Sequence, residues 1–289
     1  MRVAAMDGPF GAAVTGLDVS TPLDETTVRA LVAALCEHHI LLVTDQHLSS
    51  ESYARFGRYF GEPISFFVPG HRDKELPELI RITNSPKTPP ESRDGAMHWH
   101  SDSSYEAVPA SVTMLYAIEV PAAGNDTLFA DTAAAYDALP EETKQRIDDL
   151  QVIHDPRGGN VNIDGETRGQ GSTEPLPTVE HPLVMCHPIT GRRSLFGFSG
   201  TACGIVGREE ADAIALLLEL KRHALQERFR QRARAELGSI LIWDNYAVVH
   251  SATPTVYSDR DGERRLLHRI STRGLPRGLP DRPLNAATS

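Results

Sequence analysis

Two polar segments that lie far apart in the chain place the strongest constraint on its fold. The first, His98–Asp102, reads His-Trp-His-Ser-Asp, and the second, Trp243–Val249, leads into His250. Residues two apart on an extended segment point to the same face, so His100 and Asp102 can bind one ion together. A third ligand at His250 would complete the two-histidine, one-carboxylate set that holds Fe(II) on one side and leaves other positions open. The fold must therefore bring both segments together, and a strand returning past the first one would do so.

The hydrophobic pattern predicts an α+β fold with an antiparallel β core, flanking helices and long loop inserts. Helices are expected over 24–38, 49–60, 132–139, 140–150 and 208–225. Strands are expected over 39–44, 110–119, 183–187, 193–198, 239–243, 247–251 and 266–272. The Pro- and Ser-rich stretch 84–96 and the Gly- and Pro-rich stretch 155–180 are expected to be loops near the site. We expect one domain over 1–289, with a tail from about residue 274.

Composition narrows the classes of partner. The chain has 289 residues and a net charge of -10, from 29 basic and 39 acidic side chains. This balance argues against nucleic acid or an anionic membrane as a partner, and a homo-oligomer stays open. No apolar run reaches transmembrane length and the N-terminus lacks the pattern of a secretory signal, so a cytoplasmic protein is expected. The three cysteines (36, 186 and 203) are too few and too widely spaced for a disulfide framework or zinc knuckle, and apolar packing is expected for each.

Several candidate site residues have a structural alternative. His98 lies two residues from His100 and competes with it as a metal ligand. His250 follows a buried-strand pattern and a turn at Asp244-Asn245, where Asp244 can serve as a turn residue. A single His-x-Asp pair is a weak signal by itself, because such pairs also occur on surface loops.

Basic side chains offer candidate sites for an anion. Arg265 and Arg269 are four apart on an expected strand, so both face one side. A buried arginine needs an anionic partner, either the carboxylate of a ligand or a structural ion pair. Arg157 could reach an anion from its loop, and Gly124–Thr127 is expected to be a turn whose Thr127 hydroxyl could also bond a carboxylate.

Taken together, several motifs resemble the taurine dioxygenase/TfdA family of Fe(II)- and 2-oxoglutarate-dependent dioxygenases. The resemblance spans about residues 8–273. It is carried by 100–105, 115–117, 120–121, 124–131, 243–245 with 250, and 264–269. It implies a double-stranded β-helix (jelly-roll) core. It also implies an oxidoreductase that converts 2-oxoglutarate and O₂ to CO₂ and succinate while it oxidises a small substrate.

The resemblance assigns roles to individual residues. His100, Asp102 and His250 are implied as the iron ligands and the catalytic centre. Thr127 and Arg265 are implied to bind the carboxylates of 2-oxoglutarate, with Arg264 as the alternative to Arg265 because the spacing from His250 suggests an insertion near 259–263. Asp102 stands where halogenating relatives have Gly or Ala, so hydroxylation or desaturation is expected.

The residues expected to contact the substrate differ in part from those of the taurine enzyme. Arg269 matches the arginine that binds sulfonate there, which predicts a substrate with an acid group. The taurine enzyme has a substrate-binding histidine where this chain reads Ile-Ser-Phe-Phe at 64–67, so Phe66 and Phe67 are expected to contact an apolar part larger than taurine's chain. Arg157 is the remaining substrate candidate. The stretches 154–157 and 199–201 also resemble relatives that form isonitriles, which gives an alternative oxidative outcome. A catalytically silent binding protein is the alternative from another class.

Overall fold

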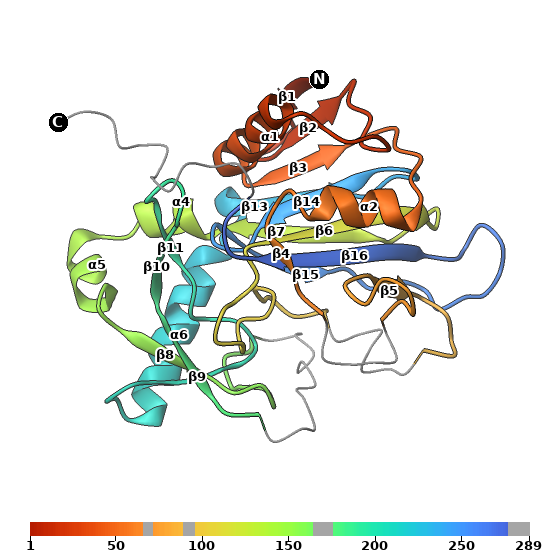
Figure 1. The fold of residues 1–289 in the computed structure, drawn as a ribbon. Coiled ribbons are helices and arrows are strands. Elements are labelled where there is room, and N and C mark those ends of the chain that lie inside the picture. The colour runs from red at the N-terminus through yellow and green to blue at the C-terminus, as the bar shows by residue number, and fades with distance from the viewer. Residues whose placement is uncertain (66–71, 89–95, 164–175, 277–289) are drawn as a thin grey trace.

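The computed structural model of the chain describes residues 1–65, 72–88, 96–163 and 176–276. Its largest sheet has eight strands in the order β1-β2-β3-β14-β6-β16-β4, with β5 also paired to β16 (Figure 1). Their bounds are β1 Arg2–Ala5, β2 Ala12–Thr15, β3 Ile40–Val43, β4 Glu62–Pro63, β5 Ile80–Thr83, β6 Val112–Glu119, β14 Ile240–Asp244 and β16 Leu266–Arg273. Within this sheet β2 and β3 run parallel, and the other described pairs are antiparallel.

A smaller antiparallel sheet faces the large one. It has the order β13-β7-β15, with β13 spanning Arg230–Arg234, β7 Asp126–Asp131 and β15 Val248–Ala252. An apolar core lies between the sheets, and in it Phe129 of β7 contacts Trp243 of β14 with ring centroids 5.6 Å apart. Because β14 belongs to one sheet and β15 to the other, the short turn between them carries the chain across this core. The Asp244 carboxylate accepts a hydrogen bond from Tyr246 N at 2.9 Å in that turn, which confirms Asp244 as a turn residue.

Two helices cover the outer face of the large sheet. Helix α1 (Glu25–His38) begins after Asp24, whose side chain accepts a bond from Thr27 N, and it ends at His39, which is left-handed with φ 63. Helix α2 spans Ser50–Gly57 and buries Tyr53, whose hydroxyl donates to backbone carbonyls of both β6 and β16. The apolar faces of both helices share one core with the outer sides of β3, β6, β14 and β16.

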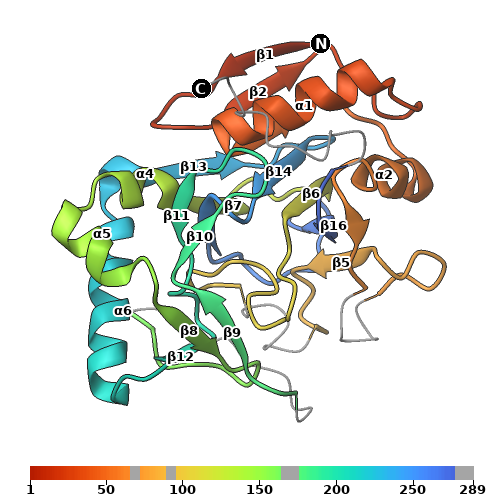
Figure 2. The same cartoon turned by 60° about the vertical axis from the view of Figure 1, so that its left-hand side comes forward.

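The remaining elements form a third layer beside the smaller sheet (Figure 2). Its helices are α4 Thr132–Asp137, α5 Glu141–Ile147, α6 Glu210–Ala224 and the 3-10 turn η2 Glu227–Phe229. Its strands are β8 Gln151–His154, β9 Val179–Pro182, β10 Val184–Cys186, β11 Arg193–Leu195 and β12 Ala202–Ile205. Helix α6 packs on β12, and its buried Lys221 donates to Val161 O at 2.8 Å, which ties the helix to the start of the long insert.

The five expected helices and the seven expected strands are all present, with ends that differ by a few residues. The strands missed from sequence are β1, β2, β4, β5, β7, β8, β9, β12 and β13. The expected turn at Gly124–Thr127 is right for Gly124 and Asn125, which have positive φ, but β7 already begins at Asp126. Stretches 155–180 and 84–96 lie partly outside the described residues, and β9 shows that the first is not a loop throughout.

Two further sequence expectations concern the packing of the cysteines and the absence of membrane-spanning segments. All three cysteines are free, and the expectation of apolar packing is wrong for Cys186, which is exposed. Within the described residues, no helix combines the length and apolar character that a membrane span requires.

Candidate metal centre

Backbone pairing places the first and third expected ligands side by side. His100 N donates to His250 O and His250 N donates to His100 O, both at 2.9 Å, so the two residues form a reciprocal bridge. Directly opposed residues in such an antiparallel pair project their side chains to the same face. The two imidazole rings accordingly lie with centroids 4.2 Å apart. The strand that returns past the His98–Asp102 segment is therefore β15. It belongs to the smaller sheet and does not pair with β14, the strand before it in the chain.

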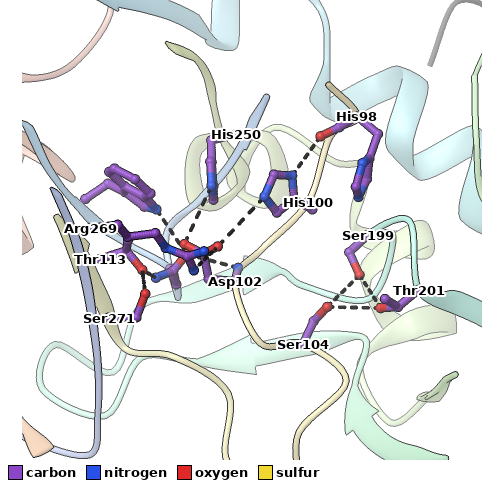
Figure 3. A network of polar contacts seen from close by, with 12 residues as sticks. His98, His100, Asp102, Ser104, Thr113, Ser199, Thr201, His250, Arg269 and Ser271 are labelled. Carbon is purple, nitrogen blue, oxygen red and sulfur yellow. Dashed lines mark hydrogen bonds and ion pairs between the residues drawn. The ribbon is translucent and has the colours of Figure 1, made fainter. Parts of the chain in front are cut away.

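The Asp102 carboxylate faces the Nε2 atoms of both rings (Figure 3). Its Oδ1 is 3.8 Å from His100 Nε2, and its Oδ2 is 3.6 Å from His250 Nε2. One nitrogen of each ring and a carboxylate oxygen all lie within 4.8 Å of one another. Asp102 and His250 are buried, while His100 is partly exposed, so one side of the cluster remains accessible. The structure thus brings together the three residues that the sequence predicts as ligands.

Burial and neighbouring charges together set the charge states of this cluster. Burial first, and then neighbouring His250, lowers the pKa of His100 to about 3; burial lowers the pKa of His250 to about 4. Burial acts to raise the pKa of Asp102, but Arg269 and the two histidines outweigh it and hold that pKa below its usual value. At neutral pH the cluster therefore presents two neutral imidazoles and a carboxylate, which are the forms that bind metal.

The tautomer of His100 follows from its hydrogen bond. His100 Nδ1 lies 2.7 Å from His98 O, and because a carbonyl oxygen can only accept, Nδ1 carries the proton. The lone pair of His100 is then on Nε2, the nitrogen that faces Asp102. His98 itself contributes this carbonyl, and its ring packs beside that of His100 with centroids 4.7 Å apart. His98 is outside the group of three that converges on one point, which favours His100 as the ligand.

A buried amide supports Asp102; sequence reasoning placed it in a turn and in the 243–245 motif but assigned it no role of its own. Asn245 Oδ1 accepts from Asp102 N at 3.3 Å and from Trp243 Nε1 at 3.1 Å. Its Nδ2 donates to Thr113 Oγ1 at 3.0 Å, so the amide joins the ligand segment to β6 and β14. The available signal was its position, a polar residue directly after a buried strand. Outer contacts of this kind orient metal ligands.

Arg269 lies against the cluster. Its Nη2 donates to Asp102 Oδ1 at 2.7 Å, so the anion that the sequence required for Arg269 is Asp102. The opposite oxygen, Asp102 Oδ2, is buried and has no hydrogen-bond partner among the described residues. The carboxylate therefore has one oxygen held by a guanidinium and one oxygen left for a further cation.

Arg265 lines a pocket that also includes Ala252, two residues after His250. The pocket is lined by Thr83, Asn84, Met97, Ala252, Thr253, Thr255, Tyr257 and Arg265. Arg265 is buried, and burial lowers its pKa. Its Nη1 donates to Thr255 Oγ1 at 3.2 Å, whereas its Nε has no partner among the described residues. Thr127, also buried, is the register partner of Ala252 and so lies beside a residue of this pocket.

The other residues expected to contact substrate or co-substrate do not lie in the cluster or in the Arg265 pocket as far as the structure describes them. Arg157 is exposed and forms an ion pair with Asp155 of its own loop at 2.7 Å. Phe66 and Phe67 lie outside the described residues. Arg264, the alternative to Arg265, is half exposed and bonds Glu119 on the surface at 2.8 Å.

Three hydroxyl side chains, of the buried Ser104 and Ser199 and the partly exposed Thr201, lie together beside the His98 ring (Figure 3). Ser104 Oγ is 2.8 Å from Ser199 Oγ and 3.0 Å from Thr201 Oγ1. Gly200 between them leaves room for the His98 ring, because a Cβ there would lie 2.5 Å from His98 Cδ2. The Ser199–Thr201 stretch thus packs against the His98–Asp102 segment, which sequence reasoning did not predict.

Comparison with known proteins identifies the family. The sequence profile of the taurine catabolism dioxygenase TauD, TfdA family matches residues 2–271. The chain belongs to this family. It is a 2-oxoglutarate-dependent dioxygenase that acts on a small organic substrate, as expected from the sequence.

Individual relatives cover most of the chain. It is 35% identical over 260 residues to the (S)-phenoxypropionate/alpha-ketoglutarate-dioxygenase of Sphingobium herbicidovorans, a match that covers 87% of this chain and 89% of the relative. It is 30% identical to the alpha-ketoglutarate-dependent sulfate ester dioxygenase of Pseudomonas putida, over 95% of this chain and 90% of the relative. The crystal structure of AAD-2 in complex with Mn(II) and N-oxalylglycine has a TM-score of 0.80 at 27% identity, over 94% of this chain and 97% of that one. The mixed fold of helices and strands is therefore the fold of this family.

Proposed function

We propose that His100, Asp102 and His250 hold Fe(II) at the catalytic centre of a jelly-roll dioxygenase. The observation that carries the proposal is the cluster itself: two neutral imidazoles and a carboxylate converge, and Asp102 Oδ2 is buried with no hydrogen-bond partner in the described parts of the chain. A divalent cation would satisfy that oxygen, and this ligand set suits Fe(II). When bound, the iron supplies the activation of O₂ that the protein's own side chains cannot provide. The two facing sheets, one antiparallel and one antiparallel except for its β2–β3 pair, support the jelly-roll assignment.

The pocket around Arg265 is our proposed site for the distal carboxylate of 2-oxoglutarate. A buried guanidinium whose Nε finds no partner within the described residues requires an anion, and a carboxylate matches its planar donor geometry. Thr255 already holds one side of the guanidinium and leaves Nε for the ligand. Thr127 is proposed as a second carboxylate contact, because its register partner Ala252 lines the same pocket.

The primary substrate is proposed to be a small acid that is hydroxylated or desaturated. Arg269 reaches the cluster and places positive charge beside the reacting centre. Phenoxypropionate and a sulfate ester, which name two of the relatives, both carry an acid group. The acid group would approach Arg269, and the remainder of the substrate would present its target carbon to the accessible side of His100. Phe66, Phe67 and Arg157 remain proposed substrate contacts.

Turnover of matched substrates tests this function. The protein is loaded with Fe(II), and succinate release and O₂ uptake are measured with phenoxy acids, sulfate esters and the methyl esters of the same carboxylic acids. We expect succinate formation coupled to oxidation of an acid and greatly reduced with its methyl ester. Equal turnover of acid and ester would overturn the anionic substrate. Absence of 2-oxoglutarate turnover across the panel, together with no binding of Fe(II), would overturn the proposed centre.

A further inference from the structure

The segment 253–265 connects β15 to β16 and forms much of the Arg265 pocket. Thr253, Thr255, Tyr257 and Arg265 all line that pocket. Figure 1 shows this connection as a blue loop that extends beyond the sheets, so its position does not follow from the two strands alone. Within it, Ser258 Oγ donates to Glu263 Oε2 at 2.6 Å, which closes a local turn but does not fix the turn to the rest of the protein.

One buried side chain attaches this segment to the large sheet. Asn84 follows β5 and is 1% exposed. Its Nδ2 donates to Val256 O at 2.7 Å and to Glu263 O at 2.9 Å. Its Oδ1 accepts from Arg265 N at 2.7 Å. A single amide therefore holds both limbs of the loop and the backbone of Arg265.

The strand register explains why an asparagine suits this position. Thr83 of β5 pairs with Leu266 of β16, so the next residues, Asn84 and Arg265, are opposed beyond the end of the ladder. The backbone carbonyl of Asn84 is used by Ser258 N at 3.1 Å, and the side-chain carbonyl takes its place for Arg265 N. Only a primary amide provides this acceptor together with two donors for the loop carbonyls.

We propose that Asn84 is a positioning residue for 2-oxoglutarate. It fixes the long 253–265 connection so that Arg265 and Thr255 face the pocket before the co-substrate arrives. A longer loop loses more conformational freedom when it is fixed, so an internal tie keeps that cost out of the binding step. The inference rests on the proposed role of Arg265. Asn84 also lines the pocket, but its Nδ2 already donates to two carbonyls of the loop.

The test measures 2-oxoglutarate binding separately from metal binding. Mn(II)-loaded wild type and Asn84→Ala are titrated with 2-oxoglutarate by calorimetry, and Mn(II) affinity is measured alone. We expect the Kd for 2-oxoglutarate to rise by about tenfold or more, the equivalent of one or more net buried hydrogen bonds, while the Kd for Mn(II) is unchanged. Amide hydrogen exchange should accelerate over 256–265. With Fe(II), KM for 2-oxoglutarate should rise more than kcat falls.

Two further variants distinguish the loss of the Asn84 amide bonds from a general loss of stability. Asn84→Asp has nearly the same volume and retains the acceptor, but it turns a carboxylate oxygen toward the carbonyls of Val256 and Glu263, so we expect it also to weaken 2-oxoglutarate binding. Gln46→Ala is the matched control. The Gln46 amide is equally buried, accepts from Val19 N, and donates to two backbone carbonyls in the N-terminal region. It should lower stability without changing the Kd for 2-oxoglutarate.

The outcomes separate this inference from the proposed function. If wild type binds 2-oxoglutarate and both Asn84 variants bind it with the same Kd, the positioning role is overturned and the clamp stands. If Gln46→Ala weakens binding as much as Asn84→Ala, the effect is general destabilisation, and the positioning role is again overturned. If wild type itself does not bind 2-oxoglutarate, the proposed pocket falls and the Asn84 role falls with it.

Discussion

Replacement of Arg265 by methionine should separate the stability of the protein from its affinity for 2-oxoglutarate. Among the described residues, the ligand-free Arg265 guanidinium is a buried cation with an unpartnered Nε and one side-chain hydrogen bond, to Thr255. Methionine fills a similar space without charge. Removal of an unsatisfied buried donor gains about 1–3 kcal/mol, and loss of the Thr255 bond costs about 1 kcal/mol. The ligand-free variant should therefore be as stable as wild type, or more stable by up to about 2 kcal/mol.

The same substitution should remove most of the co-substrate affinity. Stripping one partner from a buried charge pair costs about 2–5 kcal/mol, so the Kd for 2-oxoglutarate should rise by about 30-fold to 5,000-fold. The assay is thermal unfolding of the Mn(II) protein with and without 2-oxoglutarate. At a ligand concentration of about 100 times its Kd, wild type gains about 2.7 kcal/mol, and the variant should gain at most about 0.9 kcal/mol at that concentration, for an about 30-fold rise in Kd, and almost nothing for an about 5,000-fold rise.

Arg264→Met is the control, since Arg264 is half exposed and bonds Glu119 and Asp261 at the surface. It should leave the 2-oxoglutarate shift intact. An Arg265→Met protein that is stabilised by 2-oxoglutarate as strongly as wild type would refute the clamp. If Arg264→Met instead loses the shift, the role moves one residue upstream. A ligand-free Arg265→Met protein that is clearly less stable than wild type would refute the argument that Arg265 is held at a cost.

Three further predictions address the metal centre and pH. Asp102→Ala should abolish tight Fe(II) binding and substrate oxidation, and full turnover with one bound iron would contradict the ligand assignment. Metal analysis should give one ion per chain, and Cys36→Ala should bind the same amount. Cys36, His187 and Asp244 also converge, but His187 has no lone pair left for a metal, because its Nδ1 accepts two backbone N–H groups and its other nitrogen bonds Asp244. Burial and then Arg81 lower the pKa of His268 to about 4, so as pH drops from about 6.5 toward 4 the unfolded chain binds a proton that the folded protein does not, and the stability of the metal-free protein should fall. The denaturant midpoint of His268→Gln should decline less steeply over this pH range. A slope equal to that of wild type would contradict the prediction.

The elements predicted from sequence are those whose local pattern is strong. Helix α1 has a capping Asp24 and an apolar stripe, and β14 is a continuous apolar run, so both are recognisable alone. Strands β8, β9 and β12 are four residues each and carry polar or small residues. They are strands because they pair with one another and pack on α6, which is a property of the tertiary structure.

The candidate site divides in the same way. His100 and Asp102 share one face because of local alternation, and the ordered motifs of the family point to His250. The hydrogen bonds that support them join residues distant in sequence: Arg269 and Asp102 are 167 positions apart, and Asn84 and Arg265 are 181 apart. No local pattern marks such pairs. What sequence reasoning supplied for Arg269 was a requirement for an anion, and the structure identifies that anion as an expected metal ligand.

The charges in the proposed site indicate what kind of substrate completes it. Fe(II) brings two positive charges, and Arg265 and Arg269 bring one each. Asp102 and the two carboxylates of 2-oxoglutarate bring three negative charges, while His100 and His250 are neutral at physiological pH because burial lowers their pKa values.

One positive charge is left over in a largely buried site, where uncompensated charge is costly. It lies on Arg269, whose only anionic partner among the described residues is a carboxylate shared with the metal. A neutral substrate would leave that charge in place as it displaced water, whereas an acid with one negative charge would compensate it. This balance, together with the position of Arg269, is the physical reason to expect discrimination between an acid and its methyl ester.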